Sequence, residues 1–211
     1  MEDYLSVALP KGRLGDKVLA LFREAGIADI DVENAGRKLC IEDEKAKLRF
    51  ILVKPYDSAV FVERGAADVG VCGYDVLAEQ HSDVYELLDL GFGRCSMCVA
   101  APKDFVDDPG TPLRVATKYV NAAEEYFSAK GRDIDVIKLN GSIEPAPILG
   151  LSDVIFDIVE TGSTLKENHL EVVEKAFDIS ARFIANKSSF NFKNEQIMKI
   201  TELLSEAARK L

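Results

Sequence analysis

Histidine, the residue that enzymes most often use to move protons, is scarce in this sequence. Only two histidines occur in 211 residues, and neither His81 nor His169 stands in a recognisable Ser/His/Asp or Cys/His arrangement. Long apolar runs are also missing, since no stretch approaches the roughly 18 apolar residues of a membrane helix. The N-terminus is acidic where a signal peptide would be basic. We therefore expect a soluble, cytoplasmic protein with no contact to a membrane.

Positive charge is in short supply. The chain carries 26 basic and 36 acidic side chains, a formal net charge of −10, and its pI is near 4.8. A surface of this kind does not neutralise the phosphates of a nucleic acid or an anionic lipid. Nucleic acid is therefore not an expected partner, and any anionic ligand must be bound by local groups.

Cysteine is sparse and gives little sign of metal or redox chemistry. Cys95 and Cys98 form a CxxC motif, but the surrounding residues predict a strand. On a strand a three-residue offset places the two thiols on opposite faces. We interpret them as small buried hydrophobic residues rather than as a metal site or a disulfide.

Apolar residues are plentiful at 47% and sufficient for one large domain or two small ones. Short runs rich in Val, Ile and Leu alternate with helical periods, a pattern typical of α/β proteins with mostly parallel sheets. The pattern restarts after the loop 104–112. We predict two lobes with a cleft between them: residues 1–92 plus 178–211, and residues 93–177. The predicted strands are 4–9, 49–53, 68–72, 84–90, 95–101, 113–117, 134–139, 153–159, 172–177 and 179–185, and the helices are 14–25, 56–64, 120–130 and 194–211.

Residues 153–165 are the most informative segment. A buried strand runs into Asp157 and Glu160 and then into a hydroxyl-rich turn before a possible helix start; the turn residues are Thr161, Gly162, Ser163 and Thr164. Successive N–H groups, a glycine and three hydroxyls suit a phosphate, and the acids suit ribose hydroxyls or magnesium. The alternative is a Ser/Thr N-cap on an ordinary helix.

Four cations occupy turns or strand ends. Lys11 and Arg13 follow the first strand, where α/β proteins commonly bind ligands. Arg37 stands at a turn, and Lys54 follows the strand 49–53. They are candidates for phosphate contacts, and the alternative is that they are solvated surface cations.

Two polar turns complete the candidate site. Gly73 and Asp75 follow a buried strand, where a missing side chain lets a ligand or another backbone come close. The alternative is that Gly73 simply ends the strand and Asp75 caps a following helix. A polar loop after the strand 134–139 holds Asn140, Gly141, Ser142 and Glu144, which are expected to line the cleft opposite Lys11 unless they form a plain turn.

Several motifs together resemble the ATP phosphoribosyltransferase family over nearly the whole chain, in order. They are Ala8–Leu14 (ALPKGRL), Gly65–Gly73 (GAADVGVCG), Asp75–Leu77 (DVL), Lys138–Glu144 (KLNGSIE), Ala146–Leu151 (APILGL), Glu160–Thr164 (ETGST) and Asp178–Arg182 (DISAR).

The resemblance implies the first reaction of histidine biosynthesis, in which N1 of ATP is joined to C1 of phosphoribosyl pyrophosphate with release of pyrophosphate. It implies magnesium held by the pyrophosphate rather than by the protein. It also implies catalytic roles for Lys11, Arg37 and Lys54. Two positions depart from the family pattern, because relatives usually carry arginine at Lys54 and often lysine at Tyr74. A lysine keeps the charge of arginine but loses its bidentate fork.

The resemblance also has implications for assembly. Family members with a histidine-binding regulatory domain are longer, so this chain resembles the short form. It is then expected to form a homodimer and to work with a regulatory subunit related to histidyl-tRNA synthetases.

Two alternative functions remain at this point. Two α/β lobes around a cleft are also the architecture of periplasmic solute-binding proteins of type II, and fold alone does not settle function. The other alternative is a phosphoribosyltransferase that acts on a free base.

Overall fold

The computed structural model describes residues 4–30 and 37–210 of the chain. Within these ranges the chain divides into two compact units. Unit 1 comprises Met1–Leu77, His81–Gly93 and Ser180–Leu211, and unit 2 comprises Ala78–Gln80 and Arg94–Ile179. Leu211, which belongs to the predicted closing helix, lies outside the described residues.

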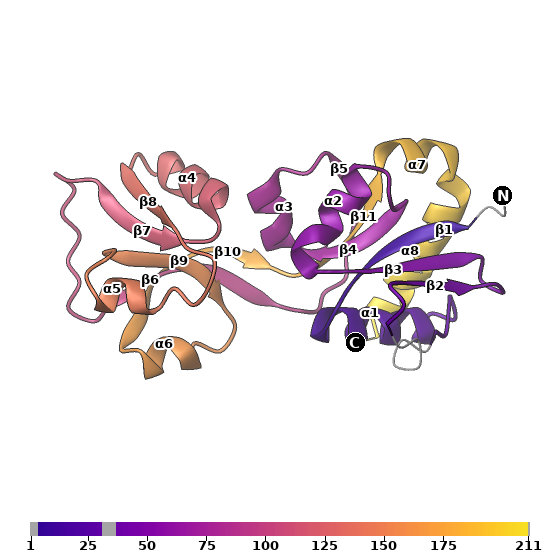
Figure 1. The fold of residues 1–211 in the computed structure, drawn as a ribbon, viewed down its shortest axis with the longest axis horizontal. Helices are drawn as coiled ribbons and strands as arrows, with labels where there is room; N and C mark the ends of the chain where they lie inside the picture. Colours follow the sequence, from indigo (N-terminus) through magenta and orange to yellow (C-terminus); the bar gives the residue numbers. More distant parts are fainter. Residues whose placement is uncertain (1–3, 31–36, 211) are drawn as a thin grey trace. The chain divides into compact units, whose positions relative to one another are not determined.

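Unit 1 is built on a six-stranded sheet with the strand order β2-β3-β1-β4-β11-β5 (Figure 1). The strands are β1 (Leu5–Pro10), β2 (Cys40–Asp43), β3 (Leu48–Val53), β4 (Val69–Gly73), β5 (Val84–Asp89) and β11 (Ala181–Asn186). The helices are α1 (Arg13–Glu24), α2 (Ser58–Glu63) with the short 3-10 turn η1 (Pro55–Asp57) before it, α3 (Tyr74–Gln80), α7 (Lys187–Phe192) and α8 (Asn194–Ala208).

Helices cover both faces of this sheet, because successive side chains of a strand point to opposite faces. Leu5, Val7 and Leu9 of β1 pack in one cluster with residues of α1 and α8. Ala8, between them, belongs to a second cluster that contains residues of α2 and α3. The carboxyl ends of β1, β3 and β4 lie at the same end of the sheet, because β1 pairs in parallel with the other two strands. The turns that carry the candidate residues of unit 1 begin at this end.

Unit 2 is built on a five-stranded sheet with the order β10-β6-β9-β7-β8. Its elements are β6 (Cys95–Pro102), β7 (Leu113–Thr117), α4 (Val120–Ala129), β8 (Ile134–Lys138), α5 (Pro145–Ile148), β9 (Val154–Val159), α6 (Ser163–Glu167) and β10 (Leu170–Ile179). Ile155 of β9 packs in an aliphatic cluster with Leu165 of α6. Its neighbour Phe156 points to the other face and contacts Phe127 of α4, with ring centroids 6.1 Å apart.

The prediction of mostly parallel sheets is wrong, because both sheets are mixed. Four strand pairs are parallel, namely β1–β3, β1–β4, β7–β8 and β7–β9, and five are antiparallel in the described residues. Alternating strands and helices predict parallel crossovers only where consecutive strands stay in one sheet. Here β6 and β11 enter their sheets without such a crossover, and a tight turn joins β2 to β3.

The predicted strands and long helices are present, with shifts of a few residues at their ends. Strand β2 and helices α5 and α7 were not predicted, and they have only four to six residues each. Cys98 is buried as predicted, whereas Cys95 is partly exposed, and none of the four cysteines, all of them in the described part of the chain, forms a disulfide. None of the helices in residues 4–30 and 37–210 is both long and apolar enough to cross a membrane.

Candidate functional site

The hydroxyl-rich turn of unit 2 links β9 to α6. Gly162 is the N-cap of α6 and has φ 72°, a left-handed conformation that glycine adopts without steric cost. The hydroxyls of Thr161 and Ser163 lie 3.0 Å apart, and the Ser163 N–H points to Thr161 Oγ1 at 3.4 Å. Because α6 has only five residues, its dipole is small, and the turn's own N–H and hydroxyl groups are the donors available to an anion.

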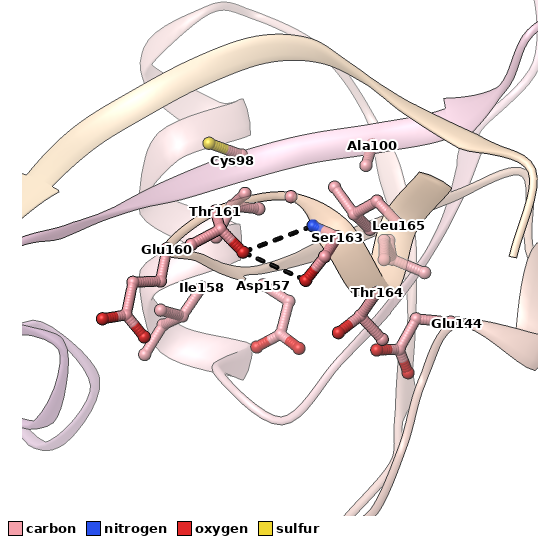
Figure 2. Close-up of a pocket in the computed structure, with 13 residues that line it drawn as sticks. Cys98, Ala100, Glu144, Asp157, Ile158, Glu160, Thr161, Ser163, Thr164 and Leu165 are labelled. Atoms are coloured by element: carbon pink, nitrogen blue, oxygen red, sulfur yellow. Dashed lines mark hydrogen bonds between the residues drawn. The ribbon is translucent and has the colours of Figure 1, made fainter. Parts of the chain in front are cut away.

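This turn forms one wall of a cavity of about 300 Å³ (Figure 2). The cavity lies within unit 2 and is also lined by residues of β6, β9 and the loop before α5. Six of the predicted site residues line it together, namely Asp157, Glu160, Thr161, Gly162, Ser163 and Thr164. The prediction that these residues share one site is consistent with the structure.

The lining of this cavity is acidic. Glu144, Asp157 and Glu160 are carboxylates, and none of the thirteen lining residues, all of them described, is lysine or arginine. In Figure 2 the carboxylates of Asp157 and Glu144 lie on the same side of the turn. Cys98 also lines the cavity, and burial raises the pKa of its thiol above its usual value. A polyanion bound here would therefore need a cation from outside the lining.

Gly141 and Ser142 do not line this cavity. Both are exposed on the loop after β8, and a Cβ added to Gly141 would meet no atom within 4 Å. Glu144, at the end of the same loop, is the residue that reaches the cavity. Of the predicted loop residues, Glu144 lines this cavity, and the expectation that Gly141 and Ser142 line a cleft between the lobes stays a prediction.

A second strand-turn-helix in unit 1 carries the predicted cations. Gly12 is the N-cap of α1 and has φ 82°, and the Lys11 N–H donates to the Val53 carbonyl at 2.8 Å. A cavity of about 480 Å³ lies beside this turn and is lined by both Lys11 and Arg37, with Lys38 next to them. Its other walls are mostly aliphatic. This combination can bind an anionic group next to an apolar one.

The remaining predicted cations lie outside the lining of that cavity. Arg13 is the first residue of α1, and Lys54 is exposed at the end of β3, where it is the N-cap of η1. Lys54 therefore follows β3 as Lys11 follows β1. Because β1 and β3 pair in parallel with Pro10 opposite Val53, the two cations leave the sheet at the same edge.

Gly73 and Asp75 lie against one another at the start of α3. A Cβ added to Gly73 would lie 2.1 Å from Asp75 Oδ1, so the chain's own carboxylate occupies that space. The guanidinium of Arg182 lies over the ring of Tyr74, 5.1 Å from its centroid. Arg182 is in turn paired with Glu86 at 2.9 Å and Asp89 at 3.2 Å. The close approach at Gly73 is therefore intramolecular in this structure.

Lys118 was missed by the sequence reasoning. It follows β7, which pairs in parallel with β9 through Val115–Val154 and Ala116–Ile155. Strand β7 ends at Thr117, whose hydroxyl donates to the Phe156 carbonyl at 2.7 Å, so Lys118 follows a residue that contacts the neighbour of Asp157. The Lys118 ammonium lies 4.6 Å from the centroid of the Tyr119 ring. The signal that could have found it is the one used for Lys11, a cation directly after a parallel strand.

Comparison with known proteins decides the family. A family model described as HisG, ATP phosphoribosyltransferase, matches residues 54–206, more than half of the chain. The chain belongs to the ATP phosphoribosyltransferase family. Curated ATP phosphoribosyltransferases from Thermoanaerobacter sp. (strain X514) and Clostridioides difficile (strain 630) are 53% and 50% identical to it. The alignments cover 97% of this chain in both cases, and 96% and 98% of the two relatives.

Solved structures agree with membership in the ATP phosphoribosyltransferase family. A chain of the ATP phosphoribosyl transferase (HisG:HisZ) complex from Thermotoga maritima is 34% identical, with a TM-score of 0.84 over 98% of this chain and 100% of that one. The periplasmic aliphatic sulphonate binding protein SsuA from Escherichia coli is 12% identical, with a TM-score of 0.59 over 98% of this chain and 72% of that one, which shows the fold alone. The predictions of the family, of a transferase and of a periplasmic-binding-protein-like α/β fold are confirmed.

Proposed function

We propose that this chain transfers the phosphoribosyl group of phosphoribosyl pyrophosphate to N1 of ATP and releases pyrophosphate, the first step of histidine biosynthesis. The observation that carries this proposal is the cavity of unit 2, which is lined by the turn Glu160–Thr164. The chain that holds this cavity is about 50% identical to curated ATP phosphoribosyltransferases. The solute-binding alternative has only the fold likeness in its favour, since SsuA is 12% identical.

The cavity of unit 2 suits phosphoribosyl pyrophosphate. The 5-phosphate is bound by the N–H and hydroxyl groups of the turn from Thr161 to Thr164, which offer donors without charge. Asp157 and Glu160 accept hydrogen bonds from the ribose hydroxyls. N1 of adenine carries no proton in neutral ATP, so neither carboxylate needs to act as a general base. Catalysis then depends on positioning and on stabilising the charge of the departing pyrophosphate.

Magnesium is the proposed cofactor, and the donor set of the cavity fits an ion that is shared with the substrate. In the two described ranges no group of three or more His, Cys, Asp and Glu side chains is arranged to hold a metal. Mg²⁺ usually keeps several waters and takes one or two carboxylates together with substrate phosphates. Asp157 and Glu144 are the residues that would assist in holding it. When bound, the ion offsets the charge of the pyrophosphate beside an acidic lining.

Unit 1 carries cations of its own that suit a polyphosphate. Lys11 and Arg37 line one cavity, and an ATP triphosphate beside them would place its adenine near aliphatic walls. For Lys54, at the same sheet edge as Lys11, we propose assistance to the departing pyrophosphate. Among unit 2 residues, Lys118 is the candidate for a further phosphate contact.

The chain is proposed to act in the cytoplasm as a homodimer that binds a separate regulatory subunit. The Thermotoga maritima neighbour was solved as a HisG:HisZ complex and is covered over its whole length by this chain. The curated relatives are likewise covered over 96% and 98% of their lengths. We expect weak activity and little inhibition by histidine for this chain alone, and strong histidine inhibition of the isolated chain would contradict the proposal.

The decisive experiment measures phosphoribosyl-ATP formation by its ultraviolet absorbance with ATP, phosphoribosyl pyrophosphate and Mg²⁺. We expect product with ATP and none when a free purine or pyrimidine base replaces it. Product with a free base and none with ATP would instead support the free-base alternative. Omission of Mg²⁺ in the presence of a chelator should abolish turnover.

A further inference from the structure

Helix α6 is too short to be stable by itself, yet three of its residues line the cavity in unit 2. It runs from Ser163 to Glu167, and its first three residues, Ser163, Thr164 and Leu165, all line the cavity. Isolated helices need about 12–15 residues to be even marginally stable in water. The position of the Thr164 hydroxyl and N–H must therefore be set by contacts at the ends of this short helix.

Asn168 makes those contacts at the carboxyl end. Its side-chain Nδ2 donates to the Thr164 carbonyl at 2.9 Å, and its backbone N–H donates to the same oxygen at 3.2 Å. The backbone N–H also lies 3.1 Å from the Leu165 carbonyl. One residue thus fixes the carbonyl of Thr164 through two bonds. Neither bond involves a group that would touch a ligand.

The chain on either side of Asn168 is anchored. Leu165 and Leu170 are both buried in the aliphatic cluster that includes Ile155 of β9. Between them His169 has φ 57°, a left-handed conformation that costs a non-glycine residue of order 1–3 kcal/mol. A strained residue persists only where its surroundings impose it, and here the two leucines and the Asn168 bonds do so.

We propose that Asn168 is a positioning residue for phosphoribosyl pyrophosphate: its side-chain amide holds Thr164 in place, so that the N–H and hydroxyl of Thr164 face the substrate phosphate. The inference rests on the proposed function of this cavity. Loss of the Nδ2 bond frees the last turn of α6 and moves Thr164 with it. Because binding groups are effective only in the correct geometry, a small displacement weakens substrate binding while the chemistry at the ribose stays intact.

The test compares Asn168→Ala and Asn168→Asp with the wild-type chain in the phosphoribosyl-ATP assay. Aspartate keeps the size and the backbone N–H of asparagine but has no Nδ2 donor. We expect both variants to raise KM for phosphoribosyl pyrophosphate about tenfold, with KM for ATP and kcat changed less than about twofold. Unchanged KM for phosphoribosyl pyrophosphate in both variants, or an equal rise for the two substrates, would overturn the proposal.

His169→Gly is the matched control within the same turn. It removes the left-handed strain but leaves the bonds from Asn168 to Thr164 in place, so Tm should rise while both KM values stay at the wild-type level. If His169→Gly raised KM for phosphoribosyl pyrophosphate as strongly as Asn168→Ala, a general loosening of the turn would replace the specific role of Asn168.

The proposed function can fail independently of Asn168. If the wild-type chain formed no phosphoribosyl-ATP, that function would be wrong. Calorimetric titration with phosphoribosyl pyrophosphate alone would then decide the role of Asn168, because binding weakened about tenfold only in the two Asn168 variants supports it and equal binding overturns it.

Discussion

The two glycine turns of this protein share a positive φ but differ in the rest of their backbone, since Gly162 is left-handed with ψ 7° whereas Gly12 has ψ −161°. Gly12 in unit 1 and Gly162 in unit 2 have φ values of 82° and 72°, and both are the N-cap of a helix that follows a strand. The first turn carries Lys11 and borders a cationic cavity. The second carries hydroxyls and borders a cavity with three carboxylates. The two turns therefore have in common a glycine N-cap after a strand, and they differ in ψ and in the charge of the side chains around them.

The helices that follow these turns are held in different ways. Helix α1 has twelve residues and packs its apolar face in the core of unit 1. Helix α6 has five residues and depends on the turn formed by Asn168 and His169. The turn of unit 1 is thus held by the packing of a long helix, and the turn of unit 2 is held by the buried Leu165 together with the hydrogen bonds of Asn168. Substitutions should separate these two mechanisms.

The largest effect is expected for Gly15→Ala in unit 1. A Cβ at Gly15 would lie 1.8 Å from the Pro10 carbonyl oxygen, so α1 must move away from the strand end. We expect a loss of about 3 kcal/mol or more in the free energy of unfolding, measured by urea denaturation. Gly141→Ala is the control, since a Cβ there meets no atom within 4 Å. A neutral Gly15→Ala would show that packing does not hold the first turn.

The next effect concerns Asp68, which directly precedes β4. It therefore lies at the end of the unit 1 sheet that is opposite the turns with the candidate residues. Its carboxylate accepts bonds from the backbone and side chain of Ser6, from Ser189 and from Lys193 of the segment before α8, at 2.7–3.0 Å. Burial alone would raise the pKa of Asp68, but these hydrogen bonds outweigh it and hold the pKa below its usual value. A lowered pKa in the folded state adds stability at pH values above that of the unfolded group.

Asp68→Asn should therefore cost about 2 kcal/mol of unfolding free energy at pH 7, because it removes a charged acceptor. The difference from wild type should shrink as the pH falls below about 4, where the carboxyl of the unfolded chain takes up a proton, and should be lost once the folded carboxyl is also protonated. Urea denaturation at several pH values measures this, and kcat should not change. A constant difference down to the pKa of the folded group would contradict the role of the charge.

Lys54→Ala tests the role of the cations near the turn of unit 1. Turnover should fall more than about tenfold, or about 1.4 kcal/mol of transition-state stabilisation, with a modest effect on ATP binding. Arg64→Ala, at the end of α2 in the same unit, is a matched control for the loss of one exposed positive charge. Unchanged turnover in Lys54→Ala would remove Lys54 from the mechanism.

The smallest effect is expected for Glu160→Gln on the acidic side. One hydrogen bond to a ribose hydroxyl contributes about 1 kcal/mol, so KM for phosphoribosyl pyrophosphate should rise about fivefold. Steady-state kinetics with saturating ATP measure it. If the reaction were abolished while phosphoribosyl pyrophosphate still bound normally, Glu160 would have a chemical role instead.

Local patterns in the sequence were sufficient to predict the long elements. Strand β9 is apolar except for Asp157, and the apolar face of α1 repeats with the helical period, so neighbours along the chain carry the information. Strand direction was predicted wrongly because it depends on partners far away. For example, β11 lies between β4 and β5 and runs antiparallel to both, although about a hundred residues separate it from them.

The candidate site was predictable where one short segment holds several groups. The residues from Asp157 to Thr164 line one cavity because a single turn carries most of them. Glu144 reaches the same cavity from a different loop, whereas Gly141 on that loop does not, and only the folded path of the loop decides which of them faces inward. Lys118 was overlooked because its position beside β9 depends on the pairing of two strands.

The insertion of β11 between β4 and β5 also sets an order in time. The strands of unit 2, β6 to β10, lie in one continuous stretch, so that sheet can close as soon as residue 179 has left the ribosome. The sheet of unit 1 lacks the strand between β4 and the edge strand β5 until residues 181–186 are made. During synthesis β4 and β5 therefore present unpaired backbone groups. Unit 1 begins with the first residues to be synthesised, but its sheet is the last to be completed.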